Sequence, residues 1–177
     1  MSATIPILPV QQAAVPLERD LFLRTLVREL ANVLDSMVGD AEASSFISMV
    51  GQAMGRQIDR MYKAELGAVK LDAEQVASVL VDLKHRIKGD FYLVELTPDR
   101  MVFGNRACPF ADKVVGRRSM CMMTSNVFGV ITANNLGYGK VELQETIADG
   151  DAGCRVIVHL RQTPEAVAAE GREYLGG

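Results

Sequence analysis

The 177-residue sequence has no tryptophan, only two histidines and only three cysteines. No stretch reaches the roughly 18 consecutive apolar residues that a membrane-spanning helix needs, so we expect no membrane association. Walker, G-x-S-x-G and H-E-x-x-H motifs are absent, which argues against nucleoside triphosphatases, α/β-hydrolases and zinc proteases. A net charge of −3 argues against broad nucleic-acid binding. The chemistry that remains available lies mainly in the cysteines.

The first sixteen residues are apolar and contain three prolines. They lack the basic start and the long apolar run of a signal peptide, so residues 1–16 are interpreted as a flexible arm and the location as cytoplasmic. Clustered cysteines in a reducing compartment more often bind metal or act in redox chemistry than form disulfides.

The first half of the chain has helical periodicity. Apolar residues recur at three- and four-residue steps over 17–38, 40–66 and 72–88, and in the first segment Leu23, Leu26, Leu30, Val33 and Met37 share one face. The third segment ends in the run 84–88, with Lys84, His85, Arg86 and Lys88. We interpret this run as a solvated helix end that interacts with the helix dipole, with an anion-binding patch as the alternative.

Gly51 and Gly55 form a G-x-x-x-G pattern inside the second predicted helix. Each glycine in a helix interior costs roughly 0.5–1 kcal/mol relative to alanine. The pair therefore predicts a close approach of another backbone. A tight crossing within the chain and a dimer seam both satisfy the pattern.

The second half alternates with the two-residue period of strands. Residues 91–96 and 101–104 form one predicted hairpin, 119–135 a helix, and 140–147 and 154–160 a second hairpin. We therefore predict an α+β fold, with N-terminal helices followed by a four-stranded antiparallel sheet built from two hairpins that flank a helix. The predicted domain spans 17–162, and residues 163–177 form a tail with a short helix. Exposed sheet edges favour a homodimer.

The three cysteines are Cys108, Cys121 and Cys154, each beside a predicted turn or element end. Three thiolates suit Zn²⁺ with a fourth ligand, or an iron–sulfur cluster. A helix N-terminus would lower the pKa of Cys121 and make it a reactive thiol. Structural, unliganded cysteines remain the third interpretation, because buried free cysteine is common.

Several segments around these cysteines resemble a known family. They are the run from Asn105 through Cys108-Pro109-Phe110, the stretch 121–129, Gly137-Tyr138, and the turn 147–154 that ends at Cys154. Together they resemble methanogen output domain 1. More loosely, the pattern is similar to the sensory half of iron–sulfur-dependent repressors and to vinyl-4-reductase-type sensing domains. The repressors' winged helix-turn-helix has no counterpart here, so direct DNA binding is not implied.

The resemblance implies a non-enzymatic sensory domain in which Cys108, Cys121 and Cys154 bind a metal, an iron–sulfur cluster or a small ligand and signal through a dimer. The cofactor it suggests is an iron–sulfur cluster or zinc, with an empty site as the other outcome. Two alternatives stay open. One is a thiol redox switch or enzyme that uses Cys121, and the other is an interaction scaffold with structural cysteines.

Overall fold

The computed structural model describes residues 14–176. Its helices are α1 (Arg19–Val38), α2 (Asp40–Leu66), α3 (Ala73–Arg86), α4 (Met122–Leu136) and α5 (Pro164–Ala168). Its strands are β1 (Phe91–Leu96), β2 (Arg100–Asn105), β3 (Tyr138–Glu145), β4 (Cys154–His159) and β5 (Arg172–Leu175). Short 3₁₀ turns are η2 (Ala111–Val114), η3 (Arg118–Cys121) and η4 (Ile147–Asp149). The predicted arm lies largely outside the described residues.

The α+β class is as predicted, but the sheet has five strands and not four. Its order is β1-β2-β4-β3-β5, with every neighbouring pair antiparallel. The extra strand, β5, comes from the predicted tail and pairs with β3. Its Tyr174 is buried and shares a hydrogen bond of 3.1 Å with the hydroxyl of Ser125 on α4. The burial of Tyr174 explains why the predicted tail joins the sheet as a fifth strand.

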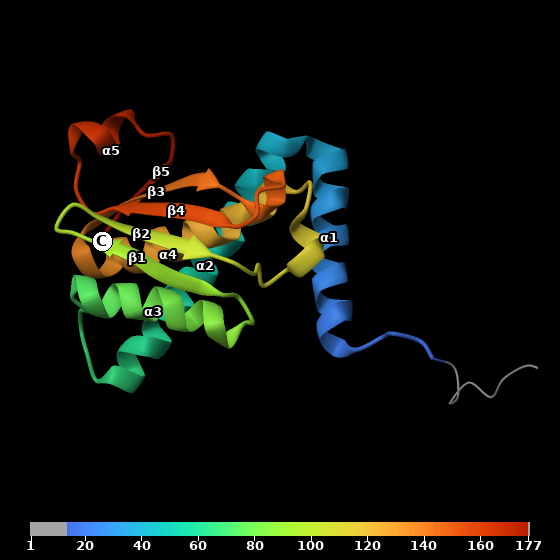
Figure 1. Ribbon diagram of the computed structural model, residues 1–177, viewed down its shortest axis with the longest axis horizontal. Helices are drawn as coiled ribbons and strands as arrows, with labels where there is room; N and C mark the ends of the chain where they lie inside the picture. Colours follow the sequence, from blue (N-terminus) through green and yellow to red (C-terminus); the bar gives the residue numbers. More distant parts are fainter. Residues whose placement is uncertain (1–13, 177) are drawn as a thin grey trace, which may run out of the picture.

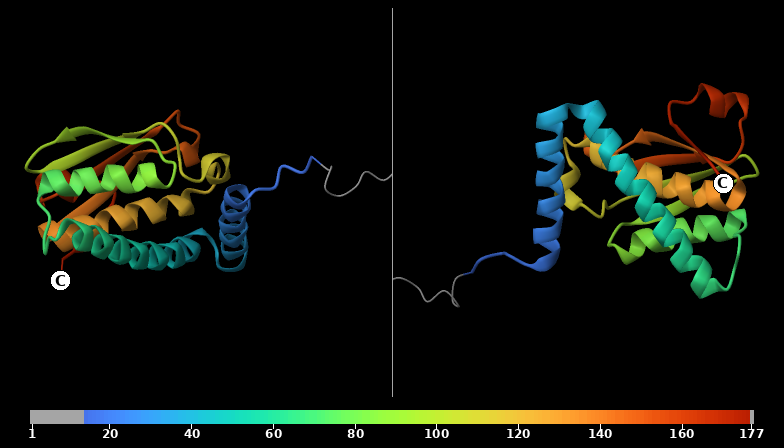
Figure 2. Two further views of the ribbon diagram at one scale, coloured as in Figure 1. Left: turned by 90° about the horizontal axis from the view of Figure 1, so that it is seen from below. Right: turned by 180° about the vertical axis from the view of Figure 1, so that it is seen from behind.

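Helices α2, α3 and α4 stack on one face of the sheet (Figures 1 and 2). The helices α3 and α4 lie against the sheet, and α2 lies beneath α4. Most of α4 is buried, so it has no polar face. Its Phe128 meets the rings of Phe91 and Phe103 edge-on, with centroids 5.5 and 5.4 Å apart. The core thus lies between α4 and the middle of the sheet.

The two glycines of α2 lie where this helix crosses α4. A Cβ on Gly51 would lie 2.8 Å from Cβ of Asn126, and one on Gly55 would lie 3.0 Å from Cβ of Val130. Contacts under about 3.0 Å do not occur without something shifting. Gly51 and Gly55 therefore allow two helices of the same chain to approach closely, rather than forming a seam between copies.

The first helix stands apart from the sheet, at one end of the molecule (Figures 1 and 2). Ala31 is its only fully buried residue. The apolar residues that share one face, including Leu23, Leu30 and Met37, point into solvent. Within the described residues, no helix combines the length and the apolar character that crossing a membrane would require.

Candidate three-cysteine site

Three elements that are distant in the sequence bring the cysteines to one place. Cys108 lies in the loop that leaves β2, Cys121 ends η3 and caps α4, and Cys154 begins β4. All three line one small cavity of about 30 Å³, and all three are free thiols. Its other walls include Phe91, Pro109, Phe110 and Met120. A space of this size corresponds to about one water molecule.

The side chain of Asn105 bonds to Cys154 and to the backbone of Ala107, the residue before Cys108. Its amide nitrogen donates to the sulfur of Cys154 at 3.5 Å, and its amide oxygen accepts from the backbone N–H of Ala107 at 3.2 Å. The second bond is an Asx-type turn, which turns the chain toward Cys108 as it leaves the sheet. Asn105 and Cys154 are also register partners across β2 and β4. The end of the β2–β4 strand pair therefore fixes the relative placement of Cys108 and Cys154.

Lys84 lies on α3 beside this cavity, and it is the residue that the sequence interpretation placed wrongly. It is only 4% exposed, whereas His85, Arg86 and Lys88 are exposed as expected. Its ammonium donates a hydrogen bond of 2.7 Å to the hydroxyl of Thr124, a cavity-lining residue. The sequence contains an indication of this burial, because Lys84 lies one helical turn after Leu80, which is buried.

Among the residues that the structure describes, no carboxylate pairs with Lys84. Its nitrogen lies 5.1 Å from the ring centroid of Phe91 and 5.4 Å from that of Phe128. Burial lowers the pKa of Lys84 to about 8, and the nearby Cys108, Cys121 and Cys154 oppose that shift. Within residues 14–176, the only negative charge that can form close to this ammonium is on the three thiols. A buried cation without a counter-ion is costly, so the site is complementary to negative charge.

Burial keeps Cys108 and Cys121 protonated in the absence of a ligand. It raises the pKa of Cys121 to about 12, with smaller contributions from charge on Cys108, Cys154 and Asp149. Burial also raises the pKa of Cys108, although backbone N–H groups and Lys84 act in the opposite direction. The expectation that a helix N-terminus lowers the pKa of Cys121 is therefore wrong, because desolvation outweighs the dipole.

The histidine on the same strand as Cys154 lies on the opposite face of the sheet, where it cannot act on the thiols. His159 on β4 is buried, with Nε2 3.2 Å from a carboxylate oxygen of Glu142. Strand parity separates it from Cys154, as the five-residue spacing requires. No cysteine–histidine pair therefore forms among the described residues around the cavity.

The three thiols are suitable ligands for a soft metal ion. In the described residues, however, they are not arranged closely enough to bind one. Three thiolates with a divalent ion give a net charge of −1, which Lys84 can balance. In the described part of the chain, however, no three His, Cys, Asp or Glu side chains are arranged tightly enough to hold a metal. Cys108, Cys121 and Cys154 would have to move together, and a cluster of several irons would need a larger space than about 30 Å³.

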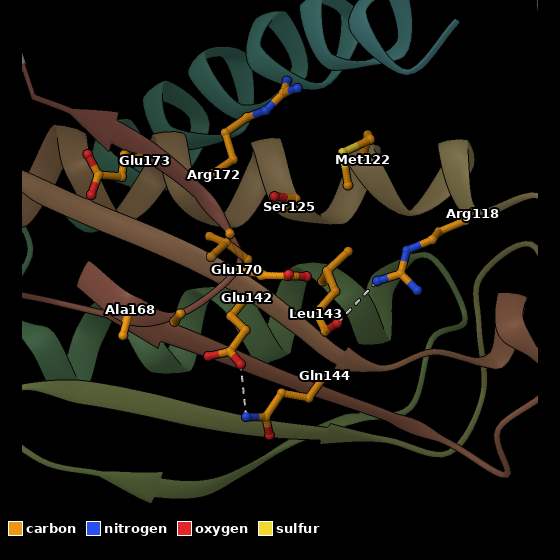
Figure 3. Close-up of a pocket in the computed structure, with 13 residues that line it drawn as sticks. Arg118, Met122, Ser125, Glu142, Leu143, Gln144, Ala168, Glu170, Arg172 and Glu173 are labelled. Carbon is orange, nitrogen blue, oxygen red and sulfur yellow. Dashed lines mark hydrogen bonds between the residues drawn. The ribbon is translucent and has the colours of Figure 1, made fainter. Parts of the chain in front are cut away.

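A larger hollow of about 970 Å³ opens between β3 and the α5–β5 segment (Figure 3). Its walls carry both charges, and several of these groups are already paired. Arg118 contacts the carbonyl of Leu143 at 3.5 Å, and Gln144 donates to Glu142 at 3.0 Å (Figure 3). It contains no cysteine, and its open, mixed surface has no reactive arrangement.

Comparisons with known proteins support one family and one fold. A family model described as methanogen output domain 1 matches residues 26–159. No curated protein matches. Among solved structures, the phenol-responsive sensory domain of the transcription activator PoxR with phenol is similar at a TM-score of 0.63 and 14% identity, over 87% of this chain and 81% of that one.

A second similar structure is a trafficking protein particle complex subunit 3 from Naegleria fowleri, covalently bound to palmitic acid. It has a TM-score of 0.59 and 12% identity, over 89% of this chain and 98% of that one. At these identities, the likeness to both structures concerns the fold.

Proposed function

Because the chain belongs to the methanogen output domain 1 family, we propose that it is a sensory domain whose input site is the three-cysteine cavity. Cys108, Cys121 and Cys154 would hold a soft metal ion such as Zn²⁺ as thiolates, and Lys84 would supply the counter-charge. The observation that carries the proposal is the buried Lys84 ammonium, which faces three thiols and has no carboxylate partner. A bound divalent ion would lower the thiol pKa values and release their protons.

The size of the cavity favours an ion over an aromatic ligand. The two similar structures carry phenol and palmitic acid. An engineered cavity that accepts benzene measures about 150 Å³, whereas the three-cysteine cavity measures about 30 Å³. An iron–sulfur cluster remains compatible with the donor set if the loop at Cys108 moves outward.

Contacts between the cavity wall and α1 provide a route for the signal. Val114 and Met120 in the segment between Cys108 and Cys121 line the cavity. Arg28 of α1 donates to the carbonyls of Lys113 and Val115 in the same segment, at 2.6 and 3.0 Å. Drawing the thiols onto an ion would therefore move the surface on which α1 rests.

Metal content tests this function directly. The protein is purified in parallel under air and without oxygen, and its metal content and absorption spectrum are measured. We expect about one soft metal ion per chain, and a Cys108→Ser variant that folds but loses it. Metal-free, colourless protein from both preparations, with no thermal stabilisation by added Zn²⁺, would overturn the proposal.

A further inference from the structure

The first helix is oriented with its polar side toward its own domain. Arg28 binds two backbone carbonyls of the η2 segment, and Arg117 donates to Asn32 and lies 3.6 Å from Asp35. These side chains occupy the side of α1 that meets the body. Directional hydrogen bonds thus fix which face of the helix points outward, and that face is the apolar one.

Eight large apolar side chains cover the outward face, each between 37% and 76% exposed. They are Phe22, Leu23, Leu26, Val27, Leu30, Val33, Met37 and Val38. Arg19, Glu29 and Ser36 are the only exposed polar residues of α1. A single helix with such a surface is unusual for a monomer, because exposed apolar patches rarely exceed a few hundred Å².

The spacing of this surface is that of a helix–helix seam. Leu23, Leu26, Leu30, Val33 and Met37 follow one another at steps of three, four, three and four. This is the a/d pattern of a two-helix contact, in which each side chain inserts between residues of a facing helix. Such a stripe is self-complementary, so a second copy supplies a matching surface.

The area also matches what a dimer requires. With roughly 100 Å² exposed on each of the eight side chains, α1 offers about 800 Å², which is what one partner contributes to a stable interface. The start of α2 extends the surface with Phe46, Met49 and Val50, all exposed. Two heptads of seam, about four helical turns, are short for a coiled coil on their own, and these residues broaden the contact.

A lipid surface fits this helix less well. Helices that bind membrane surfaces carry Lys and Arg on the polar face that remains in water. In α1, Arg28 is committed to backbone carbonyls, and Arg24 lies 3.2 Å from Asp20 and 3.9 Å from Asp112. Arg24 and Arg28 therefore serve the attachment of α1 to its own domain, which leaves Arg19 as the one exposed basic residue of the helix.

We infer that α1 is the contact helix of a homodimer, in which the stripe Leu23–Met37 of one copy packs against the same stripe of another. The apolar start of α2 closes the edge of this interface. The inference depends on α1 and its contacts, and it stands whether or not the cysteines bind a metal.

Sedimentation velocity on the full chain, from about 1 to 100 µM, tests this interface. We expect a species of twice 19.3 kDa. Leu30→Glu should raise the dissociation constant by at least about 100-fold, because the symmetric contact carries the change twice. The matched control is Val69→Glu, at an 89% exposed residue outside α1 and α2, which should leave the constant unchanged.

Far-UV circular dichroism confirms that each variant is folded, and a photo-crosslinker at position 26 identifies the partner segment. Crosslinks from position 26 to residues 19–50 of a second copy support the inference. A monomer at 100 µM, a dimer insensitive to Leu30→Glu, or a monomer that binds anionic vesicles through α1 would each overturn it.

Discussion

Replacing Lys84 with methionine should stabilise the metal-free protein. Lys84 is almost fully buried, and its pKa falls from 10.5 to about 8. Each pKa unit corresponds to about 1.36 kcal/mol, so the charged side chain costs the fold about 3 kcal/mol at neutral pH. Methionine keeps most of the volume and removes the charge. It also leaves the Thr124 hydroxyl without its donor, which costs about 1 kcal/mol.

The expected net gain for Lys84→Met is therefore about 2 kcal/mol at pH 7. The pH dependence follows from linkage. Because the folded pKa of Lys84 is the lower one, the unfolded chain binds more protons between pH 8 and 10.5, and the cost of Lys84 shrinks as pH rises through this window. The advantage of the variant is constant below pH 8 and should fall by about 1 kcal/mol between pH 7 and 9.

Urea unfolding, followed by far-UV circular dichroism in reductant and chelator, measures both quantities. The raised pKa values of Cys108 and Cys121 remove stability above pH 9 in both proteins, so the two proteins are compared between pH 7 and 9. Lys70→Met, at an exposed lysine, is the control and should change stability by less than about 0.5 kcal/mol. A destabilised Lys84→Met variant with no pH dependence in the difference would refute the reasoning.

Three further predictions concern the packing and the thiols. Gly55→Leu should destabilise the fold by about 3 kcal/mol or more in urea unfolding, since even a Cβ meets Val130 at 3.0 Å, while dimer dissociation of the folded fraction stays unchanged. Iodoacetamide should alkylate Cys121 at least tenfold more slowly than free cysteine at pH 7.5, because burial raises the pKa of this thiol to about 12. Mass spectrometry measures the rate, and a rate equal to that of free cysteine would contradict the burial of Cys121. Tyr174→Phe should cost about 1 kcal/mol through loss of the Ser125 bond, and an unchanged midpoint would show that β5 is not held there.

Much of the fold follows from local signals in the sequence. Helix α2 begins after Gly39, which has a φ of 85°, and ends at Gly67, which is left-handed. Helix α3 begins with the capping box of Asp72 and Gln75. Such signals act within a few residues, which is why helix limits and both hairpins could be predicted. The positions of the cysteines at element ends allow them to meet, and the fold brings all three to one cavity.

The remaining features depend on which residues pack against each surface. The periodicity of the sequence does not show this. Helical spacing shows that Leu23 and Leu30 share a face, but not that Arg28 turns that face outward by binding carbonyls about 85 residues away. Strand β5 has four residues and gains its stability from β3 and α4. The charge of Lys84 predicts exposure to solvent, although its place one turn after Leu80 puts it on the buried side.

The most direct test of the three-thiolate site is a Co²⁺ titration of reduced, metal-stripped protein, followed by thiolate-to-metal absorption. We predict one ion per chain, tighter binding as pH rises because three protonated thiols must ionise, and loss of the band in Cys108→Ser, Cys121→Ser and Cys154→Ser. Lys84→Met should weaken binding about tenfold or more, since a unit charge a few ångströms away contributes ~2–4 kcal/mol at an effective dielectric of ~20. A band that survives each cysteine replacement, or an affinity that Lys84→Met leaves unchanged, would contradict the account.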